Sequence, residues 1–349
     1  MNDGSLAEAL AAIQRAVPQP LLDGEGWLRL LEVAGTLPAV LARRPVGLEL
    51  RLAGDAQADL VVSARPREPD GRALLAWARS AGMAELALAL ERWRSGFGWL
   101  AWNADYLLLE FDAATDVRAP PCIHLAPRGA ANEGPVAVSD NAFDADPAGL
   151  VGALAALSGA PPDPTAVEGL ERLLAGLPPF AEMFIAGTML SRDSVRSPRV
   201  AVRRLRPEGV ATVLSVMDRS EVAEQLLPLA AELDSLGARL MLDLDVGASA
   251  PAFAGLEVHH TRSYWSEGRS DGWAPALDVL VAWGLAERDR ADAAIGLPGS
   301  RGPDGPLFGI SHAKVGADAA GLRPAKLYLG IDRVHAAVEL HAGQAVGVG

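Results

Sequence analysis

Cysteine is almost absent from this sequence, because Cys122 is the only one in the chain of 349 residues. A single cysteine cannot form an intramolecular disulfide and is typical of a reducing compartment. The first residues, 1–4, lack the positive charge and apolar stretch of a signal peptide, and apolar runs such as 279–285 are too short to cross a bilayer. We therefore expect a cytoplasmic protein with no membrane partner.

An excess of positive charge is missing as well. The formal net charge is -13 and the pI is about 5.0, whereas binding to a nucleic-acid backbone requires a basic face. We therefore expect no nucleic-acid partner. Hydrophobic residues make up 50% and charged residues 21% of the chain, which predicts a large folded core. The abundance of Ala, Arg, Gly and Pro suggests a bacterial origin.

The common catalytic signatures are absent too. The sequence contains no Gly-x-Gly-x-x-Gly after a strand, no Gly-Lys-Ser/Thr phosphate loop, no His-Glu-x-x-His and no Gly-x-Ser-x-Gly. Nucleotide-dependent enzymes, zinc proteases and serine hydrolases of the usual types therefore lose their sequence support.

What the sequence does contain is an element order, helix–strand–strand–helix, repeated five times. Helices are expected over 26–43, 70–80, 83–95, 147–158, 164–175, from Pro207 onward, and over 221–236, 273–285 and 288–295. Strands are expected over 47–52, 58–64, 106–112, 121–125, 182–190, 199–205, 239–246, 256–263, 308–315 and 326–331. The element at 334–340 could be a short helix or a strand.

Hairpin-linked strands are antiparallel, and closing ten of them into a barrel removes the exposed edges. The predicted fold class is therefore α+β, with five αββα units forming a ten-stranded antiparallel barrel surrounded by helices. Residues 1–25 would be a helical extension, 26–333 a single barrel domain and 334–349 a tail. The alternative is two α+β domains divided within 113–147.

The strands divide into an apolar and a polar face, because alternate residues of a strand point to opposite sides. Leu240, Leu242 and Leu244 share one face, while Arg239, Asp243 and Asp245 share the other. In an open sheet the polar faces would meet solvent. In a closed barrel they line a lumen, and the expected lining residues include Arg51, Asp112, His124, Arg239, Asp243, Asp245, His259, Trp265 and His312.

With its Lys326-x-Tyr328 motif and its fivefold αββα order, the sequence resembles the ABBA prenyltransferases, which have the PT-barrel fold. In that family Lys-x-Tyr and Arg-x-Lys pairs on neighbouring strands bind the diphosphate of an isoprenyl donor. The looser pairs are Arg199-x-Ala201-x-Arg203 and His312-x-Lys314. The resemblance covers about 26–331 and implies a diphosphate site made by Arg199, Arg203, Lys314, Lys326 and Tyr328.

The resemblance also assigns a role to Glu110, since an early-strand glutamate in the indole enzymes accepts the acceptor's hydrogen bond and later its proton. Tyr328, with Trp265 or Trp102, could cover an allylic cation with aromatic faces. For each of these residues the simpler interpretation is an ordinary ion pair or packing contact.

No cofactor is expected to be required, although Asp243 and Asp245 could together hold Mg²⁺ against a diphosphate. Equally, both carboxylates could neutralise Arg239 and Arg199. His259 and His260 are adjacent and face opposite sides of a strand, so they cannot form a metal pair by themselves. His124 shares a face with Cys122, which we interpret as an incidental neighbour rather than a nucleophile pair.

The expected partners are an isoprenyl diphosphate and an aromatic small molecule or peptide side chain, in a cytoplasmic transferase of specialised metabolism. The alternative is a non-catalytic accessory protein that uses the same barrel to bind a ligand or peptide. The acidic lumen residues and the presence of only three tyrosines favour that alternative.

Overall fold

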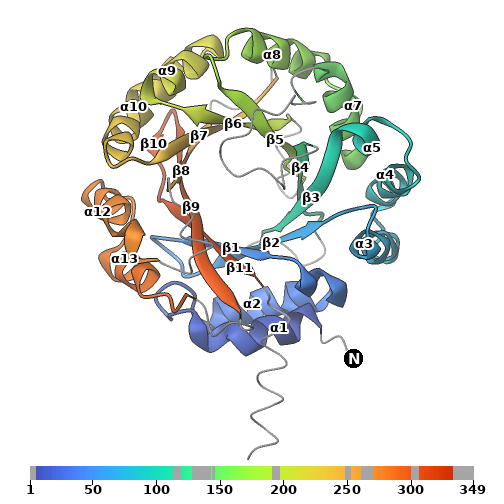
Figure 1. Cartoon of the computed structure of the whole chain (residues 1–349), viewed down its shortest axis with the longest axis horizontal. Coiled ribbons are helices and arrows are strands. Elements are labelled where there is room, and N and C mark those ends of the chain that lie inside the picture. The colour runs from blue at the N-terminus through green and yellow to red at the C-terminus, as the bar shows by residue number, and fades with distance from the viewer. Residues whose placement is uncertain are drawn as a thin grey trace, which may run out of the picture.

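Ten strands form a closed antiparallel barrel, and the helices surround it (Figure 1). The computed structural model describes residues 5–112, 119–127, 143, 146–190, 197–247, 253–260, 270–299 and 306–332. Neighbouring strands pair in the order β1 to β9, then β11, which returns to β1; the pairing of β8 with β9 completes the ring. The two-residue strand β10 only extends the hairpin at the end of β9.

The barrel strands are β1 (Val46–Arg51), β2 (Ala58–Ala64), β3 (Ala104–Phe111), β4 (Cys122–Pro127), β5 (Glu182–Thr188), β6 (Arg199–Leu205), β7 (Arg239–Asp245), β8 (Ala254–His259), β9 (Leu307–Asp318) and β11 (Lys326–Asp332), with β10 at Gly321–Leu322. The α-helices are α1 (Leu6–Ile13), α2 (Gly24–Gly35), α3 (Pro69–Ser80), α4 (Ala84–Arg94), α5 (Trp99–Asn103), α7 (Pro147–Ser158), α8 (Pro164–Ala175), α9 (Pro207–Val216), α10 (Ser220–Ser235), α12 (Ala274–Ala282) and α13 (Arg288–Ile295). Three short 3₁₀ segments accompany them, η1 (Gln14–Ala16), η2 (Ala39–Arg43) and η3 (Asp271–Trp273).

This architecture confirms the predicted ten-stranded barrel and excludes two separate α+β domains, because one continuous sheet includes strands from β1 to β11. Differences are local. The helix expected over 26–43 is divided into α2 and η2, since Pro38 cannot continue a helix and restrains the residue before it. The short helix α5 was not predicted. The element expected at 334–340 lies outside the described residues.

Proline fixes where several of the helices begin. Pro69, Pro147, Pro164 and Pro207 all stand in the first turn, where the missing N–H costs no hydrogen bond. In α7 the Asp146 side chain accepts a hydrogen bond from the Gly149 amide, and Gly159 ends the helix in the left-handed conformation. These signals place the helices directly beside the strands that they cover.

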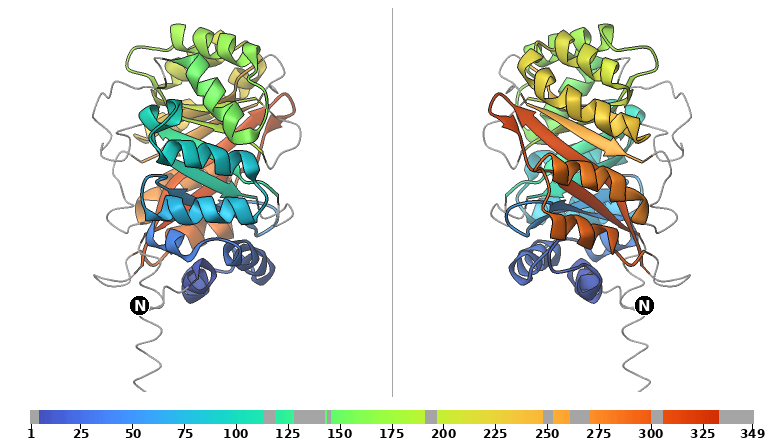
Figure 2. Two further views of the ribbon diagram at one scale, coloured as in Figure 1. Left: turned by 90° about the vertical axis from the view of Figure 1, so that its right-hand side faces the viewer. Right: turned by 90° about the vertical axis from the view of Figure 1, so that its left-hand side faces the viewer.

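The helices cover the outer face of the barrel (Figure 2), and the apolar side chains of the strands belong to the same buried cluster as those of the helices. Leu48, Leu109, Leu242 and Leu327 are completely buried in this layer. The hydrophobic core therefore forms a shell between barrel and helices, and the polar strand faces are left for the interior. Within the described ranges, no helix combines the length and the apolar character needed to span a bilayer.

The core shell predicts a clear difference between two leucines. Leu327→Ala should lower the free energy of unfolding by about 2–5 kcal/mol, because Leu327 is 0% exposed and its removal leaves a cavity. Leu28→Ala, at a side chain that is 70% exposed, should change it by less than about 0.5 kcal/mol. Urea unfolding measures both, and equal losses would contradict this placement of the core.

Candidate functional site

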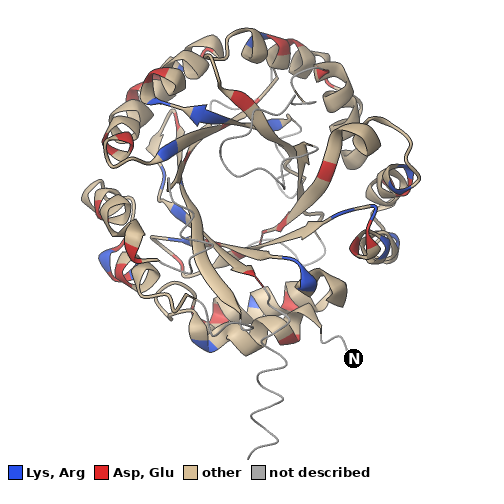
Figure 3. Ribbon diagram, viewed as in Figure 1, with Lys and Arg blue, Asp and Glu red and all other residues tan. Residues whose placement is uncertain are grey.

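The polar strand faces meet inside the barrel, and charges of both signs lie on the strands around the ring (Figure 3). Pairing brings inward-facing residues level with one another: Glu49 stands opposite both Tyr328 and Asp59, and Tyr328 also stands opposite His312. Carboxyl groups dominate the buried charged residues of the strands, namely Glu49, Asp59, Glu110, Glu182, Asp243, Asp245 and Glu257. The lumen is therefore polar, as the sequence predicted, and rich in acids.

The Lys-x-Tyr pair of β11 is held by one carboxylate. Lys326 and the Tyr328 hydroxyl donate hydrogen bonds to the two oxygens of Glu49, on the neighbouring strand β1. Burial, together with the negative charge of Glu49, raises the pKa of Tyr328 well above its usual value. Tyr328 is thus a neutral hydrogen-bond donor at physiological pH.

Lys314 is the second lumen lysine and stands directly opposite Lys326 in the pairing of β9 with β11. These are the only lysines in the sequence. Lys314 donates to Asp243 and, over 3.3 Å, to Glu257. Burial opposes the charge of Lys314, but these two carboxylates raise its pKa above the usual value, so the amine stays protonated.

The two arginines of β6 also meet carboxylates. Arg199 is buried and forms a two-pronged pair with Asp245, at 2.7 and 2.9 Å. Arg203 contacts Glu182, and its guanidinium carbon lies 4.2 Å from the centre of the Phe184 ring.

A bulge near the end of β6 turns Arg204 toward the same side as Arg203. The register shifts between Val202 and Leu205, and Arg204 has a φ of 64°. Arg204 consequently lies 3.4 Å from Glu182 and, like Arg203, lines the cavity described below. Simple alternation could not predict this arrangement, because it places consecutive residues on opposite faces.

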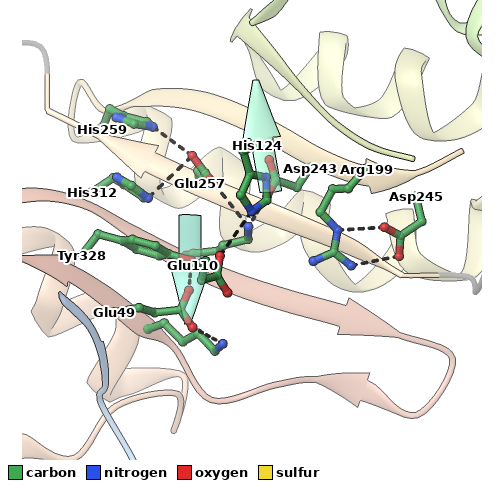
Figure 4. A network of polar contacts seen from close by, with 12 residues as sticks. Glu49, Glu110, His124, Arg199, Asp243, Asp245, Glu257, His259, His312 and Tyr328 are labelled. Atoms are coloured by element: carbon green, nitrogen blue, oxygen red, sulfur yellow. Dashed lines mark hydrogen bonds and ion pairs between the residues drawn. The ribbon is translucent and has the colours of Figure 1, made fainter. Parts of the chain in front are cut away.

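Glu110 points into the lumen, as predicted, and is 7% exposed. One of its ionisable neighbours is a histidine, since Oε2 lies 3.3 Å from Nε2 of His124 (Figure 4). A Cβ at Gly187 would lie 2.4 Å from the His124 ring, so the glycine provides space for that ring. Glu110 and His124 together form a candidate proton-accepting pair.

Three aromatic side chains stack in a row across β8, β9 and β11 (Figure 4). The His312 ring lies 4.0 Å from the Tyr328 ring and 4.8 Å from the His259 ring, both nearly parallel. Burial lowers the pKa of His312 to about 3, against the opposing effect of Glu257. His312 and Tyr328 therefore present neutral aromatic faces to the lumen.

A cavity of about 1200 Å³ occupies the end of the barrel where β7 and β9 begin. Its lining includes this aromatic row and the arginines of the rim, which are Arg44, Arg65, Arg203, Arg204, Arg206 and Arg239. Within the described part of the chain, Glu110, Arg199, Lys314 and Lys326 are not among the lining residues. Arg199, Lys314 and Lys326 thus lie farther along the lumen than the residues that line this cavity.

The other predicted lining residues are placed as follows. Arg51 stands opposite Lys326, at the end of the barrel away from the cavity. Arg239 is exposed at the start of β7, opposite His259. Asp112 is half-buried after β3, and Trp265 lies outside the described residues. Trp102 was wrongly considered as a lumen residue: it belongs to α5 and is 64% exposed.

Asp243 and Asp245 lie on the same face of β7 but contact different cations. Asp245 gives both oxygens to Arg199, while Asp243 contacts Lys314. A Mg²⁺ ion binds hard oxygens, and three of the four oxygens of these carboxylates contact two different cations. In this structure both acids neutralise cations, with Lys314 in the place expected for Arg239, and a magnesium site at the pair stays a prediction.

Sequence reasoning missed four carboxylates of the lumen: Glu49, Asp59, Glu182 and Glu257. Strand alternation could have found Glu49, which shares a face with Arg51, and Glu257, which shares one with His259. It could not have found their partners, since these depend on the register between strands that are distant in sequence.

No protein-family model matches this sequence, and no curated protein matches it. Solved structures, in contrast, match this chain. 6-Dimethylallyltryptophan synthase from Micromonospora olivasterospora, in complex with DMASPP and Trp, superposes with a TM-score of 0.55 at 15% identity, covering 95% of this chain and 96% of the other. 5-Dimethylallyltryptophan synthase from Streptomyces coelicolor superposes with a TM-score of 0.52 at 15% identity, covering 95% of this chain and 97% of the other. AnaPT from Neosartorya fischeri superposes with a TM-score of 0.52 at 10% identity, covering 95% of this chain and 93% of the other. The fold is therefore the PT barrel of the aromatic prenyltransferases, which confirms the predicted fold.

The acid-rich lumen makes stability depend on pH through Asp59. Burial, with the charges of Glu49 and Asp112, raises the pKa of Asp59 to about 8, far above its value in an unfolded chain. The folded protein then binds a proton that the unfolded chain does not between about pH 4 and 8, so stability falls as the pH rises through this window.

Asp59→Asn should remove this dependence. Relative to the parent, the variant should gain about 1–3 kcal/mol more at pH 8 than at pH 5, measured by thermal unfolding. Asp55→Asn, on the exposed loop of the same hairpin, is the matched control. An equal effect of Asp59→Asn at both pH values would show that this carboxyl group is not protonated in the folded state.

Proposed function

We propose that this protein transfers an isoprenyl group from an isoprenyl diphosphate to an aromatic small molecule or peptide side chain inside the barrel. The observation that carries the proposal is the position of Lys314 and Lys326. The sequence uses arginine for every other side chain that is permanently cationic, yet both lysines stand opposite each other in the lumen. A compact ammonium is a suitable point charge for a phosphate in a narrow space.

In the proposed reaction the diphosphate of the donor binds between Lys314 and Lys326, and the Tyr328 hydroxyl donates to it. The allylic C–O bond breaks and both electrons leave with the diphosphate. Positive groups already fixed at this position stabilise the charge that develops on the leaving group. Arg199 and Arg203 act from the neighbouring wall, as the resemblance implies.

The cavity at the rim suits an aromatic acceptor. Its volume of about 1200 Å³ exceeds that of a tryptophan or a short peptide segment, and it adjoins the stacked row of His259, His312 and Tyr328. These rings can cover an allylic cation on its way to the acceptor. Support also comes from the similar structures, among them a PriB ternary complex with L-tryptophan and dimethylallyl thiolodiphosphate, with a TM-score of 0.52 at 15% identity.

The acceptor ring then attacks the allylic carbon, a new C–C bond forms, and the ring loses a proton. Glu110 is the proposed base, and Nε2 of His124 lies 3.3 Å from its carboxylate. No cofactor is required in this scheme, since the chain's own cations oppose the diphosphate charge. In this scheme the diphosphate displaces Glu49 from Lys326 and Asp243 from Lys314.

The proposal is tested by incubating the protein with dimethylallyl or geranyl diphosphate and L-tryptophan or a tryptophan-containing peptide, with and without Mg²⁺. Mass spectrometry should detect an acceptor heavier by one isoprenyl group. Lys314→Met and Lys326→Met should each lower kcat/KM by about 10²–10³-fold, because each removes a charge aimed at the leaving group.

Arg288→Met is the matched control, since this exposed arginine pairs with Asp278 outside the barrel and should leave turnover unchanged. Absence of both product and donor binding, measured by isothermal titration, would reject the proposal. Binding of donor without release of diphosphate would instead indicate the non-catalytic accessory role.

A further inference from the structure

Two histidines and a glutamate converge on one point of the lumen wall. Glu257 and His259 lie two residues apart on β8 and therefore share a face, and His312 projects from the neighbouring strand β9. Both imidazoles direct Nε2 to the same oxygen of Glu257 (Figure 4), at 3.3 Å for His259 and 3.8 Å for His312. Of the three, Glu257 touches the proposed diphosphate residue Lys314, through Oε1 at 3.3 Å, and His312 stacks on Tyr328.

The spacing of the three groups is close to that of a metal-binding triad. One ligand atom from each lies within 4.8 Å of the others. Ligands bound to one ion at about 2.1 Å in tetrahedral geometry are about 3.4 Å apart. A small rotation of the two rings, which now stack at an angle of 24°, would therefore bring all three ligand atoms to bonding distance.

The neighbours of the triad hold it in a suitable orientation. Nδ1 of His312 lies 2.9 Å from the Ser311 hydroxyl, which can accept a hydrogen bond from Nδ1–H and so leave Nε2 unprotonated to bind a metal. Lys314 occupies the other oxygen of Glu257, at 3.3 Å, so Oε2 remains the oxygen that faces the histidines. Asp243 also pairs with Lys314, and its charge offsets that of the lysine near a bound cation.

The open side of the triad faces the cavity. His259 and His312 both line it, and the Glu257 carboxylate closes the site from behind. An ion bound here would have three protein ligands and at least one position turned toward the 1200 Å³ space. Three ligands with an open position are the pattern of catalytic rather than structural metal sites.

We propose that Glu257, His259 and His312 form a binding site for a divalent transition-metal ion of the Zn²⁺ type. The site adjoins the proposed diphosphate contacts, since Glu257 also contacts Lys314, but metal binding is measured without donor or acceptor and does not depend on prenyl transfer. A bound ion would act as a Lewis acid toward an oxygen or nitrogen atom of a molecule in the cavity.

The test uses the full chain, stripped with a chelator and titrated with Zn²⁺ by calorimetry and with Co²⁺ by visible absorption. We expect a site for one ion per chain, with the absorption bands of Co²⁺ bound to nitrogen and oxygen ligands. His259→Ala and His312→Ala should each weaken binding at least about 100-fold, as expected when a direct ligand is lost.

His260→Ala is the matched control, because His260 follows His259 directly but packs against Trp273, 4.9 Å away, instead of joining the triad. It should bind both ions as tightly as the parent. Circular dichroism verifies folding, and His312→Gln replaces His312→Ala if the latter fails to fold. The proposal is overturned if the parent binds Co²⁺ no more tightly than a folded variant lacking both His259 and His312, which would leave these residues as hydrogen-bond partners of Glu257.

Discussion

Four cations inside the barrel, Arg199, Arg203, Lys314 and Lys326, lie against carboxylates, and this pairing is the constraint on which the rest of the site depends. A buried cation without a partner is costly, and closing the sheet leaves the inward side chains little access to water. The carboxylates therefore allow the barrel to fold around its charges. The same contacts determine what the lumen can bind, because any anionic ligand must compete with Glu49 or Asp243 for the lysines.

The carboxylates that compete with an anionic ligand also position the lysines for it. Each lysine is fixed in position by its carboxylate before a ligand arrives, so the two amines need not move when a diphosphate replaces Glu49 and Asp243. Space for these long side chains comes from small residues of the strands. A Cβ at Gly255 would lie 2.7 Å from Lys314, so glycine allows this lysine to reach across β8 to Asp243. The absence of a side chain at Gly255 thus permits the ion pair between Lys314 and Asp243.

Much of the fold could be predicted from the sequence, because its signals are local. Proline at helix starts and alternating apolar residues located helices such as α8 and strands such as β6 correctly to the residue. The same alternation placed Lys326, Tyr328 and Glu110 in the lumen. The identity of each partner could not be predicted, since Glu49 and Tyr328 are 279 residues apart and meet only through closure of the barrel. The bulge at Arg204 and the exposed position of Trp102 likewise depend on tertiary packing that alternation does not describe.

The central claim is that the lumen lysines exchange their carboxylate partners for the diphosphate of a donor. A crystal structure with dimethylallyl thiolodiphosphate bound tests it most directly. We predict diphosphate oxygens within about 3 Å of the Nζ atoms of both Lys314 and Lys326, with Glu49 and Asp243 turned away. Diphosphate bound at the arginine rim, with both lysines still on their carboxylates, would contradict this account.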